Sequence, residues 1–173
     1  SSLCYTSGTT GNPKGVLYSH RSTLIHTIAA ANPDSFNLSS LDVIMPIAPM
    51  FHANAWGIPY VATMIGAKLV LPGRNLDGKS IYNLMEKEKV TFTAAVPTIW
   101  LMLFQFLETE KKKLNHLKSC AIGGSACPKV MIENFAEKHE VNVIHAWGMT
   151  ETSPLGTVNR PLNKHKEFTK EQK

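Results

Sequence analysis

The chain has 173 residues, and its 18 Lys and Arg against 13 Asp and Glu give a formal net charge of +5 at pH 7. With 43% hydrophobic and 18% charged residues, the composition excludes intrinsic disorder and a collagen-like repeat, so we expect a folded core. The basic residues form no stripe interleaved with aromatics, which argues against a nucleic-acid partner. The three cysteines show neither disulfide nor metal-ligand spacing, and a cytoplasmic location fits that usage.

The first forty residues predict a hairpin followed by a helix. Residues 3–6 have the pattern of a strand, residues 7–15 form a polar loop rich in Gly and Thr, and residues 15–19 predict a second strand. A helix over residues 22–31 should end before Pro33, because the residue before a proline disfavours helical backbone.

From residue 43 onwards, short apolar runs alternate with helical patterns. Successive strands are expected to start about 25 residues apart, the length of one strand–helix unit, near Val43, Lys68, Thr91, Ser119 and Val141. This alternation predicts an α/β fold with a mostly parallel sheet flanked by helices.

Two uncharged runs, residues 43–67 and 90–107, are long enough to raise the question of a membrane span. Both contain prolines and polar residues, so we interpret them as buried strands and helices and expect no transmembrane segment. Residues 99–107 are apolar nearly all round, which predicts a deeply buried helix.

The stretch YTSGTTGNPKG at residues 5–15 is the most informative part of the sequence. Its glycines let the backbone bend toward a ligand and expose N–H groups, its hydroxyls add donors, and Lys14 adds a positive charge. This chemistry suits a triphosphate, and a Gly-rich hairpin with solvated hydroxyls is the alternative. It is not a Walker A loop, because Lys14 is followed by Gly15 where that motif needs Ser or Thr.

Residues 6–15 resemble the phosphate-loop signature of the AMP-forming adenylating enzymes, which are the acyl-CoA synthetases, firefly-type luciferases and peptide-synthetase adenylation domains. Further segments match the motifs of that family in the required order: PMFH at 49–52, VPT at 96–98, GGSA at 123–126 and WGMTET at 147–152. The ANAW segment at 53–56 is most similar to bacterial medium- and long-chain fatty acyl-CoA synthetases.

The resemblance implies part of the large N-terminal domain of such an enzyme. We expect residues 1–162 to be a fragment of the AMP-binding domain and residues 163–173 to be a polar tail or linker. The C-terminal domain with the catalytic lysine of the family has no counterpart in this sequence. The fragment alone is therefore expected to be inactive.

For the phosphates and the metal, the resemblance assigns roles by matching position. ATP phosphates would be bound by the loop residues Thr6, Ser7, Gly8, Thr9, Thr10, Gly11 and Lys14. Thr150 would bond the α-phosphate, and Glu151, with Thr6, would bind Mg²⁺. Outside the family context, a Thr–Glu pair after a strand is more often a helix cap.

For adenine and the acid, the resemblance places Trp147 in the position of an aromatic that stacks on the base. The nucleotide site would also include Gly124, Ser125, Ala126, His145, Ala146 and Gly148. His52 would orient the substrate carboxylate and, with Lys14, Thr150 and Glu151, form the catalytic set. Trp56 would border the acyl site together with Val96, Pro97 and Thr98.

The implied activity is that of an acid–thiol ligase. A medium- or long-chain fatty acid would react with ATP to give an acyl-adenylate and pyrophosphate, and coenzyme A would then displace AMP, with Mg²⁺ as cofactor. Two alternatives stay open: an adenylating enzyme that uses another acceptor, such as a carrier protein, and a non-catalytic nucleotide-binding module. The sequence also leaves a homodimer, the acyl length and short sulfur-containing acids open.

Overall fold

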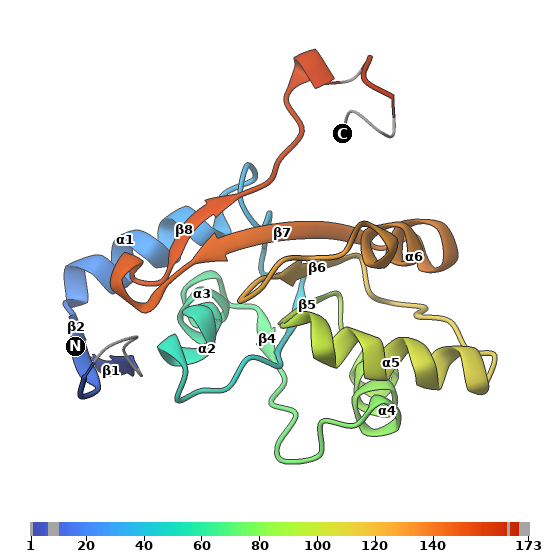
Figure 1. Cartoon of the computed structure of the whole chain (residues 1–173), viewed down its shortest axis with the longest axis horizontal. Helices are drawn as coiled ribbons and strands as arrows, with labels where there is room; N and C mark the ends of the chain where they lie inside the picture. Colours follow the sequence, from blue (N-terminus) through green and yellow to red (C-terminus); the bar gives the residue numbers. More distant parts are fainter. Residues whose placement is uncertain (1, 7–10, 166, 170–173) are drawn as a thin grey trace.

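The computed structural model describes residues 2–6, 11–165 and 167–169. Figure 1 shows a twisted central sheet with helices on both faces and a hairpin at one end. The segment after the last strand extends away from the sheet and contains the short 3₁₀ helix η2 (Asn163–His165). Within the described part of the chain, no helix combines the length and the apolar character that crossing a bilayer would require.

The hairpin is formed by β1 (Ser2–Thr6) and β2 (Lys14–Tyr18), which pair antiparallel. Helix α1 (His20–Ala31) follows directly and starts two residues earlier than the sequence predicted. The reason is Ser19, whose side chain accepts a hydrogen bond from the Ser22 N–H at 3.0 Å and so caps the helix.

The sheet has six strands in the order β4-β3-β5-β6-β7-β8. All neighbouring pairs are parallel except β7 and β8, which are antiparallel. This arrangement confirms the predicted α/β fold with a mostly parallel sheet, and it adds β8, which the sequence did not predict. The strands are β3 (Val43–Pro46), β4 (Lys68–Leu69), β5 (Phe92–Ala95), β6 (Ser119–Ile122), β7 (Asn142–Gly148) and β8 (Leu155–Val158).

The two faces of the sheet bury two separate apolar clusters, because neighbouring residues of a strand point to opposite faces. Met45, Cys120 and Ile122 pack with the helices on one face, and Ile44 and Ala121 pack on the other. The first face is covered by α4 (Gly78–Glu88), α5 (Pro97–Thr109) and α6 (Lys129–His139), and the second by α1 and α3 (Ile58–Ile65).

Helix α5 is less deeply buried than its apolar sequence predicts. Trp100 and Leu103 are fully buried, and Trp100 contacts the ring of Phe135 on α6 edge-on with centroids 5.4 Å apart. Leu101 and Met102, however, are 57% and 41% exposed. The predicted deep burial therefore holds for one face of α5 only, because this helix lies in an outer layer with one face toward the sheet.

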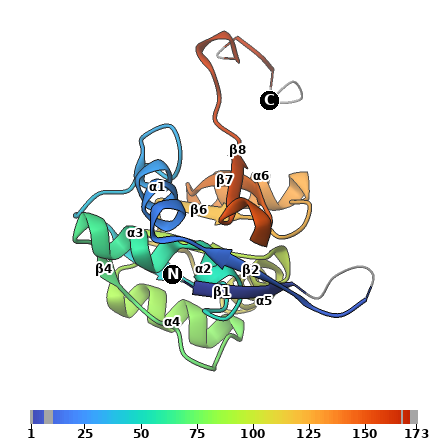
Figure 2. The same cartoon turned by 90° about the vertical axis from the view of Figure 1, so that its left-hand side faces the viewer.

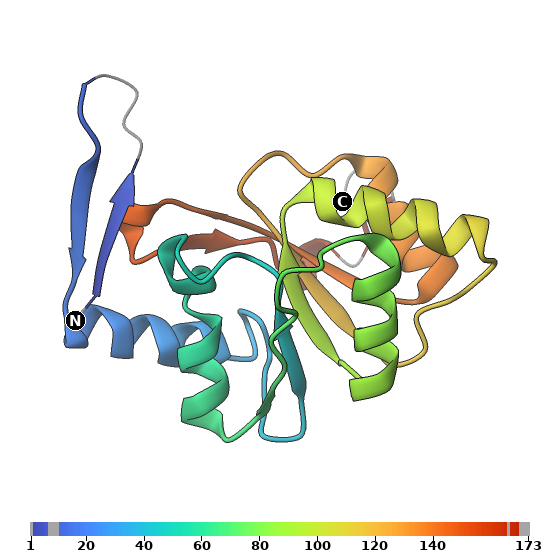
Figure 3. The same ribbon diagram turned by 90° about the horizontal axis from the view of Figure 1, so that it is seen from below.

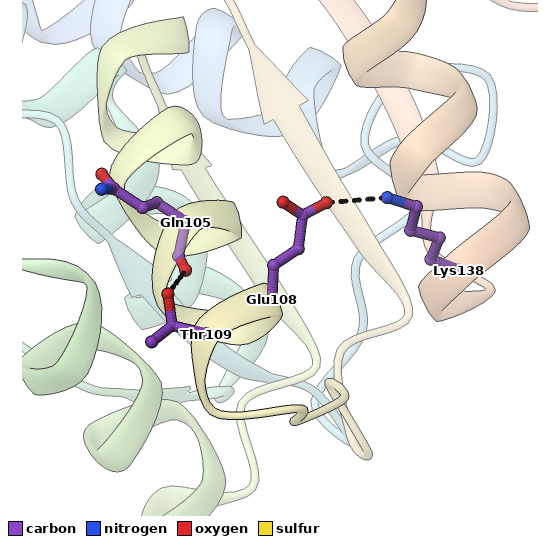
Figure 4. A network of polar contacts seen from close by, with 4 residues as sticks. All are labelled: Gln105, Glu108, Thr109 and Lys138. Atoms are coloured by element: carbon purple, nitrogen blue, oxygen red, sulfur yellow. Dashed lines mark hydrogen bonds and ion pairs between the residues drawn. The ribbon is translucent and has the colours of Figure 1, made fainter.

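An ion pair at the surface connects the C-terminal ends of helices α5 and α6, away from the carboxyl ends of the strands. Lys138 Nζ donates to Glu108 Oε1 at 2.8 Å, and Thr109 Oγ1 donates to the Gln105 carbonyl at 2.8 Å (Figure 4). The hydrogen bond from Lys138, together with its charge, lowers the pKa of Glu108. Both partners of the ion pair are more than half exposed, so it adds little to stability.

Candidate active site

A cavity of about 480 Å³ lies beyond the carboxyl ends of the parallel strands, the usual place for ligand sites in open α/β sheets. Segments from both ends of the chain surround it. Its walls are formed by Thr6, Lys14, Phe36, His52, Ala53, Trp56, Gly123, Gly124, Ala146, Trp147, Gly148, Met149, Thr150, Glu151, Pro154 and Leu155.

The hairpin contributes Thr6 and Lys14 to the cavity. These two residues face each other across the strand pair, and Thr6 Oγ1 donates to the Lys14 carbonyl at 3.5 Å. A hydroxyl-bearing residue and a basic residue thus line the same edge of the cavity. Gly11, at φ +87°, has open space around it. Ser7, Gly8, Thr9 and Thr10 lie outside the described residues.

A buried tyrosine joins the hairpin to the segment that carries Thr150. Tyr18 on β2 is 2% exposed, and its hydroxyl donates to the Thr150 carbonyl at 2.6 Å. Burial, then the nearby Cys4 and Glu151, raise the pKa of Tyr18 to about 12, so the phenol keeps its proton at neutral pH. Figure 3 shows the hairpin beside the orange-red turn that follows β7.

Thr150 and Glu151 begin the 3₁₀ helix η1 (Thr150–Thr152). The N-cap position belongs to Met149, whose N–H donates to Thr152 Oγ1 at 3.0 Å. Thr150 is therefore not the cap residue, contrary to the alternative drawn from its sequence context. Thr150 is 7% exposed and Glu151 is exposed, and both line the cavity.

One wall of the cavity combines a large aromatic side chain with glycine backbone. Trp147, at the end of β7, is 56% exposed, and Gly124 lies on the loop after β6. A Cβ at Gly148 would collide with the Pro154 carbonyl, so this position accepts no side chain. The wall thus offers an exposed ring and close backbone approach, which suits a flat ligand group.

Three residues predicted for the nucleotide site lie apart from the described cavity wall. Ser125 and Ala126 are exposed on the loop after Gly124. His145 is half-buried within β7, where its carbonyl accepts from the Asn159 N–H at 2.9 Å. Their assignment to the nucleotide site stays a prediction.

The turn after β3 has an unusual backbone. Helix α2 (Ala53–Trp56) consists of residues at positive φ, between +45° and +58°, and Gly57 follows at φ +72°. Left-handed backbone costs about 1–2 kcal/mol per non-glycine residue. Such strain is typical of functional sites, and here the turn brings His52, Ala53 and Trp56 to the cavity.

Trp56 lies against the glycine loop after β6. Its Cη2 would be 3.6 Å from a Cβ at Gly123, and its Cζ2 would be 3.8 Å from a Cβ at Gly124. Val96 also reaches this loop, since its Cγ1 would be 3.0 Å from a Gly124 Cβ. Trp56 and Val96 therefore both contact the Gly123–Gly124 loop, and of the two only Trp56 lines the described cavity.

Three further residues predicted for the acyl site lie at the start of α5. Val96 is the N-cap of α5, Pro97 is buried as its first residue, and Thr98 is exposed. They do not border the cavity that the described residues form, so their role in acid binding stays a prediction.

The sequence reasoning did not identify several residues of the cavity wall as site residues. Phe36, Ala53, Pro154 and Leu155 carry no functional group that would have singled them out. Phe36 follows α1 in a polar segment, is 2% exposed and packs on Phe92 with ring centroids 5.4 Å apart. Ala53, Gly123 and Met149 lay inside segments that match the family, and that match was the only sequence signal for them.

The residues of the cavity could hold Mg²⁺ only together with the phosphate oxygens of a bound nucleotide. Among the described residues, no group of three or more His, Cys, Asp or Glu could hold a metal ion. Mg²⁺ is commonly bound by one or two carboxylates, with waters and substrate phosphates completing its shell. The exposed carboxylate of Glu151 beside Thr6 and Thr150 matches that mode.

The fold and the cavity together define an α/β ligand-binding domain with its site at the carboxyl edge of the sheet. The chain belongs to the AMP-binding enzyme family, whose model matches residues 1–172. It is 54% identical over 173 residues to the medium-chain-fatty-acid–CoA ligase of Ectopseudomonas oleovorans and 53% identical over 172 residues to the 3-methylmercaptopropionyl-CoA ligase of Ruegeria lacuscaerulensis. These alignments cover 100% and 99% of the chain but 32% of each relative.

Solved structures show the same fold. A long-chain-fatty-acid-CoA ligase from Archaeoglobus fulgidus superposes with a TM-score of 0.80 at 30% identity, covering 96% of this chain and 35% of the other. The inhibitor-bound N-terminal domain of FACL13 from Mycobacterium tuberculosis gives a TM-score of 0.81 at 28% identity, covering 90% of this chain and 38% of the other. The match to an N-terminal domain agrees with the domain type that the sequence predicted.

Proposed function

We propose that the protein activates a carboxylic acid with ATP. The carboxylate attacks the α-phosphorus, the bond to the β-phosphate oxygen breaks, and pyrophosphate leaves. The thiol of coenzyme A then attacks the acyl carbon of the adenylate and displaces AMP. The observation that carries this proposal is one cavity that collects an ammonium group, two threonine hydroxyls, a carboxylate and an exposed indole from distant segments.

Residues of the hairpin and of η1 would bind the phosphates. Lys14, Thr6 and Thr150 would donate to phosphate oxygens, and the pyrophosphate leaving group needs such donors because it departs with several negative charges. Glu151, with Thr6, would hold Mg²⁺, which supplies further neutralisation of the phosphates when bound. The remaining loop residues, Ser7 to Gly11, belong to the same proposal by their match to the family motif.

The acid would enter from the side of the left-handed turn. His52, at the start of this turn, would orient the carboxylate, and Trp56 would border the acyl chain. Because the reaction partners are held together and the charges are stabilised, no covalent enzyme nucleophile is required.

The relatives guide the choice of candidate substrates. A medium-chain fatty acid is our first candidate, since a medium-chain-fatty-acid–CoA ligase is 54% identical. A short thioether acid is the second, because a 3-methylmercaptopropionyl-CoA ligase is 53% identical. Coenzyme A is the proposed acceptor, and a cytoplasmic location with access to ATP and CoA goes with this function.

The test is thioester formation by the protein at its natural length, followed by mass spectrometry. Straight-chain acids from two to eighteen carbons and 3-methylmercaptopropionate are offered with ATP, Mg²⁺ and CoA. Acyl-CoA that peaks with medium-chain acids would support the first candidate, and a peak at the thioether acid would support the second. Adenylation without thioester would favour another acceptor, and no acid-dependent AMP release would overturn the proposal.

A further inference from the structure

The pairing of β7 with β8 is irregular next to the exposed indole. Trp147 pairs with Thr157, but Gly148 pairs with Leu155, so Gly156 is an extra residue of β8 at this point. A bulge of this kind bends a strand and changes the direction of side chains, and it is often found beside active sites.

Gly156 lies directly against the indole of Trp147. A Cβ built at Gly156 would lie 2.6 Å from Cζ3 and 2.7 Å from Cε3 of Trp147. The φ of Gly156 is not positive, so residues other than glycine could adopt its backbone conformation. Glycine is needed here for the close approach of the ring, and not for the backbone turn.

We propose that Gly156 is a positioning residue for the nucleotide base. Its bare backbone forms a floor on which the six-membered ring of Trp147 rests, and the rest of the indole remains exposed toward the cavity. This inference rests on the proposed function, because it assumes that the exposed indole stacks on the adenine of ATP. Gly156 acts through Trp147 and touches no substrate itself.

The expected effect of adding a methyl group follows from the contact distances. Ordinary contacts between carbon atoms need about 3.5 Å or more, so Gly156→Ala would push the indole by about 1 Å. A displaced ring loses part of its stacking on the base, so the KM for ATP should rise about five- to tenfold. The kcat should stay within about twofold, because base stacking contributes equally to the ground state and the transition state.

The decisive experiment compares four variants of the protein at its natural length. Gly156→Ala is the test, and Asn159→Ala, just after the same strand and exposed, is the matched control. Trp147→Tyr replaces the indole with a narrower ring, and the double variant Trp147→Tyr/Gly156→Ala tests rescue. The measurements are the KM for ATP and kcat in acid-dependent pyrophosphate exchange, AMP affinity by calorimetry, and the melting temperature.

The inference predicts a raised KM for ATP and weaker AMP binding in Gly156→Ala, with the control unchanged. It also predicts that the double variant matches Trp147→Tyr, because the narrower ring leaves room for the methyl group. An unchanged KM in folded Gly156→Ala would overturn it. If Gly156→Ala does not fold, the double variant decides: binding equal to that of Trp147→Tyr supports the inference, and loss of folding or of rescue refutes it.

The two proposals fail in distinguishable ways. If the natural protein neither binds AMP nor exchanges pyrophosphate with any acid, the proposed function is wrong, and this inference is refuted with it. If the natural protein does both and Gly156→Ala behaves like the control, only the role of Gly156 is refuted.

Discussion

Two glycines at the ends of α3 allow a controlled test of how the left-handed turn is held. Gly57 and Gly66 have nearly the same backbone, with φ of +72° and +73°. A Cβ at Gly66 would meet nothing within 4 Å, whereas a Cβ at Gly57 would lie 2.6 Å from His26 Cε1 and 2.8 Å from its Nδ1. His26 is buried on α1, so it has little room to move away.

The expected magnitudes follow from this difference. Gly66→Ala carries only the cost of left-handed backbone, about 1–2 kcal/mol of unfolding free energy. Gly57→Ala carries the same cost plus overpacking against His26, about 1–3 kcal/mol more. The difference between the two variants therefore isolates the contact between His26 and the turn.

The assay is urea denaturation followed by circular dichroism, with unfolding free energies from linear extrapolation. We expect the difference between the two variants to shrink in a His26→Ala background, because the smaller side chain leaves space for the added methyl group. Equal destabilisation by Gly57→Ala and Gly66→Ala in the native background would refute the packing of His26 on the turn.

Three further predictions concern ionisation and the cavity. Burial lowers the pKa of His26 from its ordinary 6.5, so the stability that this residue contributes is present above pH 6.5 and is lost as the pH falls. Urea titrations should therefore show that the unfolding free energy changes less between pH 5 and pH 7 in His26→Gln than in the natural protein. Tyr18→Phe removes the buried hydrogen bond to the Thr150 carbonyl, so the unfolding free energy should fall by about 1–2 kcal/mol and the KM for ATP should rise. The control is Tyr60→Phe at a tyrosine that is 40% exposed, and this variant should match the natural protein in both measurements. Glu151→Gln should lower pyrophosphate exchange by about 100-fold and weaken its dependence on Mg²⁺; full activity in this variant, with the exposed Glu140→Gln as control, would contradict the metal role.

The approximate positions of most strands along the chain could be predicted from the sequence, but their order in the sheet was not predicted. The alternation of apolar runs and helical patterns is a local signal that repeats along the chain, and β3, β4 and β6 begin at the predicted residues Val43, Lys68 and Ser119. Strand β8 was not predicted, because it has only four residues, Leu155–Val158, and follows a polar segment. Its antiparallel pairing with β7 depends on the turn at η1.

The candidate site was predicted where a motif marks it. Thr6, Lys14, Thr150 and Glu151 lie in matched segments, and the structure brings them to one cavity. The left-handed backbone of residues 53–56 gave no signal, because Ala and Trp rarely adopt it and only tertiary packing holds it there. The contact between Trp147 and Gly156 depends on the bulge register, which a sequence pattern does not reveal.

The central claim is that the cavity joins a carboxylate to the α-phosphorus of ATP. The most direct test is exchange of labelled pyrophosphate into ATP by the protein at its natural length, with Mg²⁺ and without CoA. The account predicts exchange that requires a carboxylic acid and that is strongest with medium-chain acids or 3-methylmercaptopropionate. A folded protein that binds ATP but shows no acid-dependent exchange with any acid would contradict it.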